Sequence, residues 1–440
     1  MGGFEEESLE QPGFADRGVS EEELFRREWD VAVVGGGVIG MWSALYLARN
    51  GARVVLVDGG SGSGCCSQGS AGLLVPSRCK PLPGPGRITE GLCGLLQMPG
   101  STLSLSPGLD PDLWCWLARF ALSCRRSCFE AGARVLLEMG WRSLELMETE
   151  LSGQEGMVPA GEGVLYPYYS RRAWIGAVRE ARSKRAPGLR PRVLSAGEAR
   201  EAEPELDPAV LGAVLQERDR SVEPERLVNL LHKALQREGV SRLPHTRVYA
   251  LDSGSSGSVG RIRTTRGTLR AKQVLLATGS GTRGLLRSMG GWLPIRSGTG
   301  WSVSFGEAER QPERPMLLEE ARVGIAPWYG GFRITGGLEL TSRGTEIRRS
   351  RLQRVLRLAR AYLPGLDYSG RPLVRQGDRP LTPDGLPVLG PMPGSGNLWV
   401  AAGHANLGLT LGAASGEMVA GAMDGSGKAI GEALAPDRFL

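Results

Sequence analysis

Histidine and lysine are scarce in this sequence, with three and five residues among 440. So few imidazoles argue against a metal centre built on histidine, the side chain on which many zinc sites depend. Arginine supplies almost all of the 53 basic residues, and no basic run contains the interleaved aromatic residues typical of nucleic-acid binding. We therefore expect neither a metal ion nor a nucleic acid as a partner.

Long apolar runs are also lacking, since no stretch reaches the roughly 20 residues that cross a bilayer. The first residues show no basic and apolar export signal. All seven cysteines lie between Cys65 and Cys128, and their odd number does not suit a disulfide framework. We expect ordinary reduced thiols and a cytoplasmic location.

The chain is too long for one ordinary core, so two domains are predicted. Residues 1–28 contain nine acidic residues and three arginines, and few large apolar side chains. A segment of this composition cannot bury enough apolar surface to fold by itself. We expect a poorly ordered acidic extension there, ending in a short helix near residues 21–28.

Residues 30–58 carry the most informative pattern. An apolar, β-branched run at residues 30–34 predicts a buried strand, Gly-Gly-Gly-Val-Ile-Gly follows at residues 35–40, and an apolar helix continues from there. A second apolar run at residues 53–57 ends in Asp58. This strand–turn–helix–strand order predicts a dinucleotide-binding unit. The alternative is a plain βαβ unit with a glycine-rich turn.

Three glycines of this turn, and Asp58 after it, would each have a physical role. Gly35 permits the tight turn, Gly37 lets a pyrophosphate approach the backbone, and Gly40 lets the helix pack closely on the strand. The helix N-terminus offers free N–H groups and a positive dipole end to the phosphates. Asp58 is placed to accept hydrogen bonds from a ribose hydroxyl pair.

Further helices and strands alternate along the rest of the chain. Helices are predicted near residues 111–124, 134–151, 171–185, 225–238, 348–363 and 409–423. Strands are predicted near residues 246–251, 260–266, 273–277, 298–305, 322–340 and 397–401. This order indicates an α/β (α+β) fold, in which antiparallel β-structure and helices are inserted into a nucleotide-binding layer.

Four separated segments resemble one enzyme family: VVGGGVIG with Asp58, PDLWCWLARFALSC, VLLATGSGT, and GDRPLTPDGLPVLG with NLWVAAGHANLGLTLG. They resemble the FAD-dependent D-amino acid oxidase, glycine oxidase and sarcosine oxidase family, and the second segment looks most like bacterial D-amino acid dehydrogenase. The resemblance implies FAD, a Rossmann-like FAD-binding domain and an inserted antiparallel β-sheet substrate domain. It assigns residues 29–100, 206–290 and 375–440 to the FAD-binding domain, and residues 101–205 and 291–374 to the substrate-binding domain.

The resemblance also implies which residues contact the cofactor. The expected FAD-binding residues are Gly35, Gly37, Val38, Ile39, Gly40, Asp58, Gly59, Ser67, Ser70, Ala71, Gly72, Leu73, Val248, Ala277, Thr278, Gly279, Gly403, Asn406, Gly408, Leu409 and Thr410. A covalent bond from the flavin to Cys65 or Cys66 is a further alternative.

The implied reaction is oxidation of a C–N bond in a small amino acid. A hydride leaves Cα for flavin N5, and the resulting imino acid is hydrolysed to a 2-oxo acid and ammonia. Arg379 matches the family's substrate-carboxylate arginine, and a planar guanidinium binds a carboxylate bidentately. The alternative is a structural arginine paired with Asp378 or Asp384. His404 matches a family histidine that would act on the amine or tune the flavin, or else simply packs near it.

Two aromatic residues, Tyr166 and Trp301, are further substrate-binding candidates, although each could equally belong to the core. The sequence departs from the family pattern at three places. Arg375 stands where the family often has tryptophan, Ser70 stands where it has asparagine, and Thr299 precedes the glycine of a substrate-domain strand. These departures leave the substrate open.

Several functional alternatives therefore remain. The enzyme could be a proline or hydroxyproline dehydrogenase, or a glycine or sarcosine oxidase that produces hydrogen peroxide. It could also be a catalytically silent flavoprotein, or one subunit of a hetero-oligomeric dehydrogenase. The helix at residues 113–128 has the tryptophan and arginine content of a membrane-interface helix, so peripheral membrane or quinone contact is a further alternative to packing on its own core.

Overall fold

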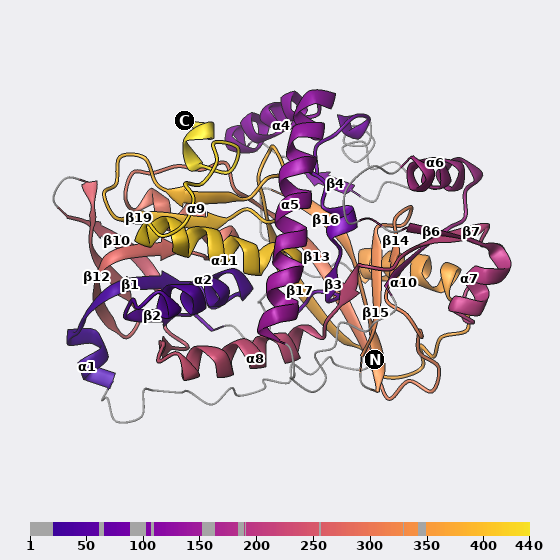
Figure 1. Ribbon diagram of the computed structural model, residues 1–440, viewed down its shortest axis with the longest axis horizontal. Coiled ribbons are helices and arrows are strands. Elements are labelled where there is room, and N and C mark those ends of the chain that lie inside the picture. The colour runs from indigo at the N-terminus through magenta and orange to yellow at the C-terminus, as the bar shows by residue number, and fades with distance from the viewer. Residues whose placement is uncertain are drawn as a thin grey trace.

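The computed structural model describes residues 21–60, 66–88, 103–106, 110–151, 163–183, 189, 191–254, 257–328, 330–341 and 349–440. Within these residues the chain forms two large β-sheets that lie side by side (Figure 1). The long helix α5 (Arg126–Glu150) runs between the two halves of the molecule (Figure 1). Most of the predicted acidic extension, and Cys65, lie outside the described residues.

The first sheet contains the predicted nucleotide-binding unit. Its strands are β1 (Glu28–Val34), β2 (Val54–Val57), β9 (Ser241–Leu243), β10 (Val248–Ser253), β11 (Val259–Thr264), β12 (Gly267–Leu276), β18 (Val388–Pro391) and β19 (Leu398–Ala402). The parallel order is β9–β2–β1–β12–β19. β10 and β11 extend from the start of β12 as an antiparallel meander, and β18 pairs antiparallel to β19.

This sheet is buried on both faces, which explains its continuous apolar runs. Val31 and Val33 of β1 point into a core shared with helices, whereas Ala32 and Val34 point into a core on the opposite face. The helical face is covered by α2 (Val38–Arg49), α5, α8 (Pro224–Arg237) and α11 (Gly408–Asp424). The other face is covered by the meander, α9 (Thr282–Arg287) and α1 (Glu21–Arg26).

The second sheet is largely antiparallel. Its strands are β4 (Leu103–Ser106), β5 (Val164–Tyr168), β6 (Pro191–Ser195), β7 (Gly212–Gln216), β13 (Arg296–Gly306), β14 (Met316–Leu318), β15 (Val323–Trp328), β16 (Gly331–Thr341) and β17 (Leu373–Leu381). Their order is β17–β13–β16–β15–β14–β5–β7–β6, with β4 beside β16. Helix α10 (Arg349–Tyr362) packs on it through an apolar stripe, and α6 (Arg171–Arg182) and α7 (Ala196–Ala202) lie near β5–β7.

The remaining elements lie outside the two large sheets. They are α4 (Pro111–Ser123), β3 (Leu73–Leu74), β8 (Arg220–Ser221) and the 3₁₀ turns η1 (Pro76–Arg78), η3 (Gly279–Gly281) and η4 (Pro436–Phe439). Helix α4 begins where the sequence predicts it, because the side chain of Asp110 accepts a hydrogen bond from the Leu113 amide. Among the helices in the described part of the chain, none is both long enough and apolar enough to span a bilayer.

The mixed α/β fold class is confirmed, but the structure divides the chain differently from the predicted domains. β7 lies within residues 206–290, yet it pairs with β5 and β6 of the second sheet. Most of β17 lies within residues 375–440, yet it pairs with β13. Helix α5, predicted in the substrate domain, packs on α11 of the first. The domain boundaries depend on which distant strands pair, and the local sequence pattern does not predict that pairing.

Candidate active site

A cavity of about 1500 Å³ is lined by residues of both sheets. At one end it reaches Asp58 and Val248 of the nucleotide-binding sheet. At the other end it reaches Trp301 and Arg379 of the second sheet. A cavity of this size can hold a dinucleotide together with a small substrate.

The turn after β1 leaves room for a phosphate group. Gly35 has φ +112°, and a Cβ there would lie 2.5 Å from the Ala277 carbonyl oxygen. A Cβ on Gly36 would lie 2.6 Å from the Asp58 carboxylate. At Gly37 the nearest atom, Ser67 Oγ, is 3.6 Å away, so this position opens onto the cavity. The three glycines therefore perform different tasks, and the third lets a ligand approach the backbone.

The start of α2 and the end of β2 complete this cradle. Helix α2 has Gly37 as its N-cap with no side-chain cap, and its first amide, Val38 N–H, donates to Ser67 Oγ at 3.2 Å. The backbone of Asp58 is fixed by hydrogen bonds with Leu243 and Thr246, at 3.0 and 2.7 Å. A helix N-terminus next to an acid at the end of β2 is what a pyrophosphate and a ribose require. The residues present therefore fit the dinucleotide FAD.

Arg379 lies at the other end of the cavity, near the end of β17. Its Nη1 donates to the Gly337 carbonyl oxygen at 2.5 Å. A Cβ on Gly300 would lie 2.5 Å from Arg379 Cζ, and a Cβ on Gly337 would lie 2.5 Å from the ring of Trp301. Gly300 thus leaves the space that the guanidinium of Arg379 occupies, and Gly337 leaves space for the ring of Trp301.

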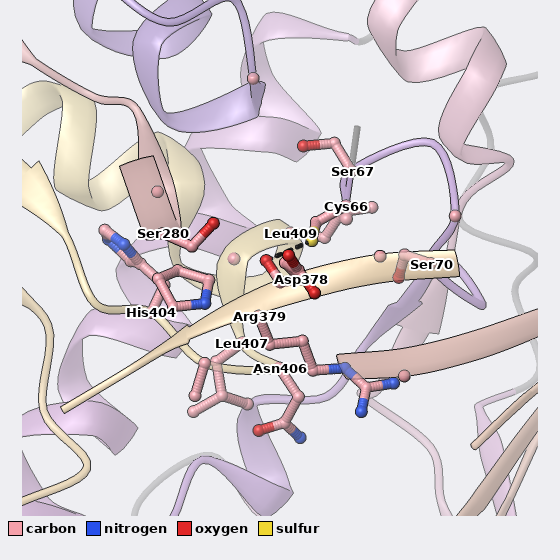
Figure 2. Close-up of a pocket in the computed structure, with 18 of the residues that line it drawn as sticks. Cys66, Ser67, Ser70, Ser280, Asp378, Arg379, His404, Asn406, Leu407 and Leu409 are labelled. Carbon is pink, nitrogen blue, oxygen red and sulfur yellow. Dashed lines mark hydrogen bonds between the residues drawn. The ribbon is translucent and has the colours of Figure 1, made fainter. Parts of the chain in front are cut away.

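The guanidinium of Arg379 has no carboxylate partner among the described residues. Asp378 leaves the opposite face of β17 (Figure 2) and accepts a hydrogen bond from Thr299 Oγ1 at 2.8 Å. Asp384 pairs with Arg438 at 2.7 Å. Burial lowers the pKa of Arg379 from its usual value, yet an arginine remains cationic at any physiological pH. The cavity therefore holds a desolvated cation that no acid among the described residues neutralises.

His404 occupies a different environment. Its side chain is buried, and its Nε2 lies 2.9 Å from Ser415 Oγ of α11. Burial lowers the pKa of His404 to about 3, so the ring is neutral near pH 7. Figure 2 shows the ring lying at the far side of the pocket from the Arg379 guanidinium. This placement supports packing on α11 more than proton transfer to an amine held by Arg379.

Most of the predicted site residues meet at the cavity. Those that line it are Gly35, Gly37, Val38, Ile39, Asp58, Gly59, Ser67, Ser70, Ala71, Leu73, Val248, Ala277, Thr278, Gly279, Trp301, Arg379, His404, Asn406, Gly408 and Leu409. These residues come from segments far apart in the sequence, so the structure unites the separate motifs in one site.

Five predicted residues do not line the cavity: Gly40, Gly72, Gly403, Thr410 and Tyr166. A Cβ on Gly40 would fall inside contact distance of the Gly35 carbonyl, and one on Gly72 would do the same to Val222. A Cβ on Gly403 would lie 2.7 Å from Thr382 Cγ2. These glycines allow close packing behind the cavity and do not line it.

Thr410 and Tyr166 are buried in hydrogen-bonded positions. Thr410 Oγ1 donates to the Leu73 carbonyl at 3.3 Å, which ties α11 to β3. Tyr166 is fully buried, and its hydroxyl donates to Asp219 Oδ2 at 2.7 Å. The substrate-binding role expected of Tyr166 is therefore corrected, because its hydroxyl faces a buried carboxylate and lies outside the cavity lining.

Sequence reasoning missed several charged residues near the substrate end. Arg78 and Glu319 both line the cavity, with Arg78 Nε 3.0 Å from Glu319 Oε1. The guanidinium of Arg78 also lies 4.7 Å from the centre of the Tyr166 ring. The position of Arg78 shortly after the predicted cofactor loop was the one sequence feature that could have indicated its place in the site. Glu319 comes from a distant turn and gave none.

Comparisons with known proteins identify the family and the fold of the chain. A family model described as DAO, FAD dependent oxidoreductase, matches residues 30–422. A D-amino acid dehydrogenase of Rhizorhabdus wittichii is 28% identical over 418 residues, which cover 93% of this chain and 100% of that protein. The structure of glycine oxidase from Geobacillus kaustophilus is similar with a TM-score of 0.71 and 24% identity, over 94% of this chain and 99% of that one. That of L-proline dehydrogenase from P. horikoshii is similar with a TM-score of 0.68 and 18% identity, over 94% and 98%.

The family match extends from the first strand of the cradle almost to the end of α11, and so includes both ends of the cavity. The similar solved structures cover both sheets, which supports the same overall fold. FAD is the cofactor that the cradle accommodates. This chain belongs to the DAO family of FAD dependent oxidoreductases.

Proposed function

We propose that this protein oxidises a small amino acid at its C–N bond and that Arg379 binds the substrate carboxylate. The observation that carries the proposal is the desolvated guanidinium in the cavity, which has no carboxylate partner among the described residues. FAD, when bound, supplies the acceptor for the hydride that leaves the α-carbon. The product is an imino acid, which water converts to a 2-oxo acid and ammonia.

The task of the protein in this reaction is to position the substrate. Gly300 leaves space for the Arg379 guanidinium, and the Gly337 carbonyl fixes one of its nitrogen atoms. The other nitrogen atoms can bind a carboxylate in a fixed orientation, which determines the direction of the α-carbon. The neutral His404, hydrogen-bonded to Ser415, need not take part in proton transfer.

The substrate that we propose is a D-amino acid. The support is the similarity over nearly the whole chain to proteins named D-amino acid dehydrogenase. Cyclic imino acids such as proline and hydroxyproline, and glycine and sarcosine, are the competing substrates. The decisive experiment mixes the purified holoenzyme anaerobically with D- and L-amino acids and these competitors, and follows the loss of the oxidised flavin absorbance. Reduction by none of them would reject the proposal.

The variant Arg379→Lys tests the role of the guanidinium. We expect KM for the best substrate to rise by about 30-fold or more, since breaking a desolvated charge pair costs about 2 kcal/mol or more. FAD should remain bound at full stoichiometry. Arg192→Lys is the matched control, because Arg192 is exposed, pairs with Glu217 and does not line the cavity. Unchanged kinetics in Arg379→Lys would remove this arginine from substrate binding.

A catalytically silent flavoprotein is not favoured by the geometry. That alternative requires Arg379 to be shielded from the cavity, and Arg379 lines it. Oxidase and dehydrogenase activities differ in whether oxygen accepts the electrons. Stoichiometric hydrogen peroxide in aerated turnover would identify an oxidase, whereas turnover that requires an added dye or quinone would identify a dehydrogenase, as we propose.

We also propose that the electron acceptor is met at a membrane surface, through the outer face of α4. Trp114 is 49% exposed and Leu122 is 59% exposed on this helix, and the exposed Arg125 and Arg126 follow it. Apolar side chains on a helix and cationic side chains just beyond its end suit the interface of an anionic bilayer. Sedimentation with anionic lipid vesicles that is lost in Trp114→Ser/Leu122→Ser would support this contact, and absence of binding by the unaltered protein would reject it.

A further inference from the structure

The loop of residues 66–71 is held from behind by a buried arginine. Arg333 of β16 is 2% exposed and does not line the cavity. Its Nη1 donates to the carbonyl oxygens of Gln68 and Ser70, at 2.6 and 3.1 Å. Its Nε donates to Ser304 Oγ at 2.9 Å, and its guanidinium lies 4.5 Å from the centre of the Trp328 ring. An arginine held on all sides in this way has a fixed orientation.

One carboxylate binds both Arg333 and a second arginine. Glu225, at the start of α8, accepts from Arg333 Nη2 at 2.6 Å and from Arg375 Nη1 at 2.5 Å. Burial raises the pKa of Glu225, but the hydrogen bonds and charge of the two arginines outweigh this and lower it overall. The network thereby joins α8 of the first sheet's core to β16 and β17 of the second. Two of the sequence's departures from the family pattern, Ser70 and Arg375, belong to it.

The two carbonyl contacts determine which way the loop's amides point. In a trans peptide, C=O and N–H are antiparallel, and the described residues contain no cis peptide bond. The N–H groups of Gly69 and Ala71 therefore point away from Arg333. Neither donates to any other group within the described residues, and both residues line the cavity. The same loop reaches β17, because the Cys66 thiol donates to the Asp378 carbonyl at 2.7 Å (Figure 2).

We propose that Arg333, held by Glu225 and Arg375, is a positioning residue that turns the Gly69 and Ala71 amides towards the flavin ring of FAD. Two amides aimed into a desolvated cavity favour negative charge on their ligand. The arginine network therefore tightens FAD binding and raises the reduction potential of the bound flavin. This inference depends on the proposed function only in taking the FAD site as the ligand site.

The test uses Arg333→Lys, which keeps the charge but cannot reach two carbonyls, Ser304 and Glu225 together. We expect the dissociation constant for FAD to rise about tenfold or more, in line with the loss of hydrogen bonds in a buried site. We also expect the midpoint potential of the bound flavin to become more negative. The matched control is Arg263→Lys. Arg263 also binds one carboxylate, because its Nε lies 2.8 Å from both oxygen atoms of Asp252, but this pair lies on the exposed meander.

A potential unchanged in Arg333→Lys would overturn the proposal even if FAD binds more weakly, because a merely structural arginine would not alter the potential. Should Arg333→Lys not fold, Glu225→Gln decides by the same two measurements, since it retains the shape of the side chain while removing the shared charge. Wild-type affinity and potential in that variant would overturn the proposal. Neither measurement uses a substrate, so failure of every amino acid to reduce the flavin would reject the proposed function alone.

Discussion

At the scale of single residues, the lack of a side chain at Gly300 determines where Arg379 can lie. We expect Gly300→Ala to displace the guanidinium, because the added Cβ would lie 2.5 Å from Arg379 Cζ. KM should rise about tenfold or more while FAD affinity stays unchanged, as steady-state kinetics and FAD titration would show. Gly306→Ala is the matched control, since Gly306 ends the same strand and has no atom near its Cβ position. Equal KM values for both variants would show that the space at Gly300 does not determine the position of Arg379.

The buried His404 gives the holoenzyme a specific pH dependence. An unfolded histidine has a pKa near 6.5, whereas burial lowers the pKa of His404 to about 3. Between these values the unfolded state binds more protons, so the free energy of unfolding falls as pH falls from about 6.5 towards 3. The slope from this one group is at most about 1.4 kcal/mol per pH unit.

We expect His404→Gln to lack this part of the slope and to retain kcat within a few-fold. Urea denaturation at pH 5, 6 and 7 measures it. His232, whose pKa burial lowers to about 4, supplies a similar slope in both proteins and serves as an internal reference. A variant with the full wild-type slope would show that His404 does not titrate as its burial requires. A large loss of kcat at constant FAD content would restore a catalytic role.

The residues that could be predicted are those whose task is local. The order Gly35 to Gly40 requires only a strand, a turn and a helix, all within one segment. Arg379, which lines the cavity, could be proposed because a motif surrounds it. Gly337 and Arg333 could not be found in this way, because their roles arise only when β13, β16 and β17 pair and bring distant residues together. Glu319 could not be found either, because it lies in the turn between β14 and β15, far along the chain from the motifs.

At the scale of elements, the contact between α2 and β1 sets the shape of the phosphate cradle. Gly40 does not line the cavity, yet a Cβ there would fall inside contact distance of the Gly35 carbonyl. We expect Gly40→Ala to push α2 away from the turn, to destabilise the protein by about 1–3 kcal/mol and to weaken FAD binding. Thermal unfolding and FAD titration measure both effects.

Gly176→Ala is the control for this change. Gly176 lies within helix α6, has open space at its Cβ position and lies outside the cavity lining. Because alanine favours a helix over glycine, this variant should be unchanged or slightly more stable. Wild-type FAD affinity in Gly40→Ala would show that the cradle tolerates a displaced helix.

The start of a helix was predicted closely where the sequence carries a capping signal, and less closely where it carries none. Helix α4 has Asp110 as its cap and Pro111 in its first turn, and begins as predicted. Helix α5 begins at Arg126 rather than near Arg134, because its first two turns are largely exposed and lack an apolar period. Strand β4 was missed because four residues in a proline- and glycine-rich stretch carry too little pattern.

At the scale of the whole molecule, the cavity joins two sheets that otherwise have separate cores. A ligand that binds only the folded protein stabilises it by RT ln(1 + [L]/Kd), about 2.7 kcal/mol at 100 times Kd. We therefore expect the melting temperature to rise with FAD concentration. ADP should fill only the cradle formed by the turn after β1 and the end of β2, and so contact one sheet. At the same multiple of its own Kd, ADP should nevertheless raise the free energy of unfolding by the same amount as FAD.

Hydrogen exchange distinguishes these two ligands and tests whether the second sheet is part of the FAD site. FAD should slow amide exchange both near Gly37 and along the strand of Trp301, whereas ADP should slow it only near Gly37, because Trp301 lines the distant end of the cavity. Equal protection of β13 by both ligands would mean that the sheets respond as one unit to filling the cradle. Protection by FAD confined to the first sheet would mean that the flavin does not reach Arg379, and would place the reaction outside the cavity described above.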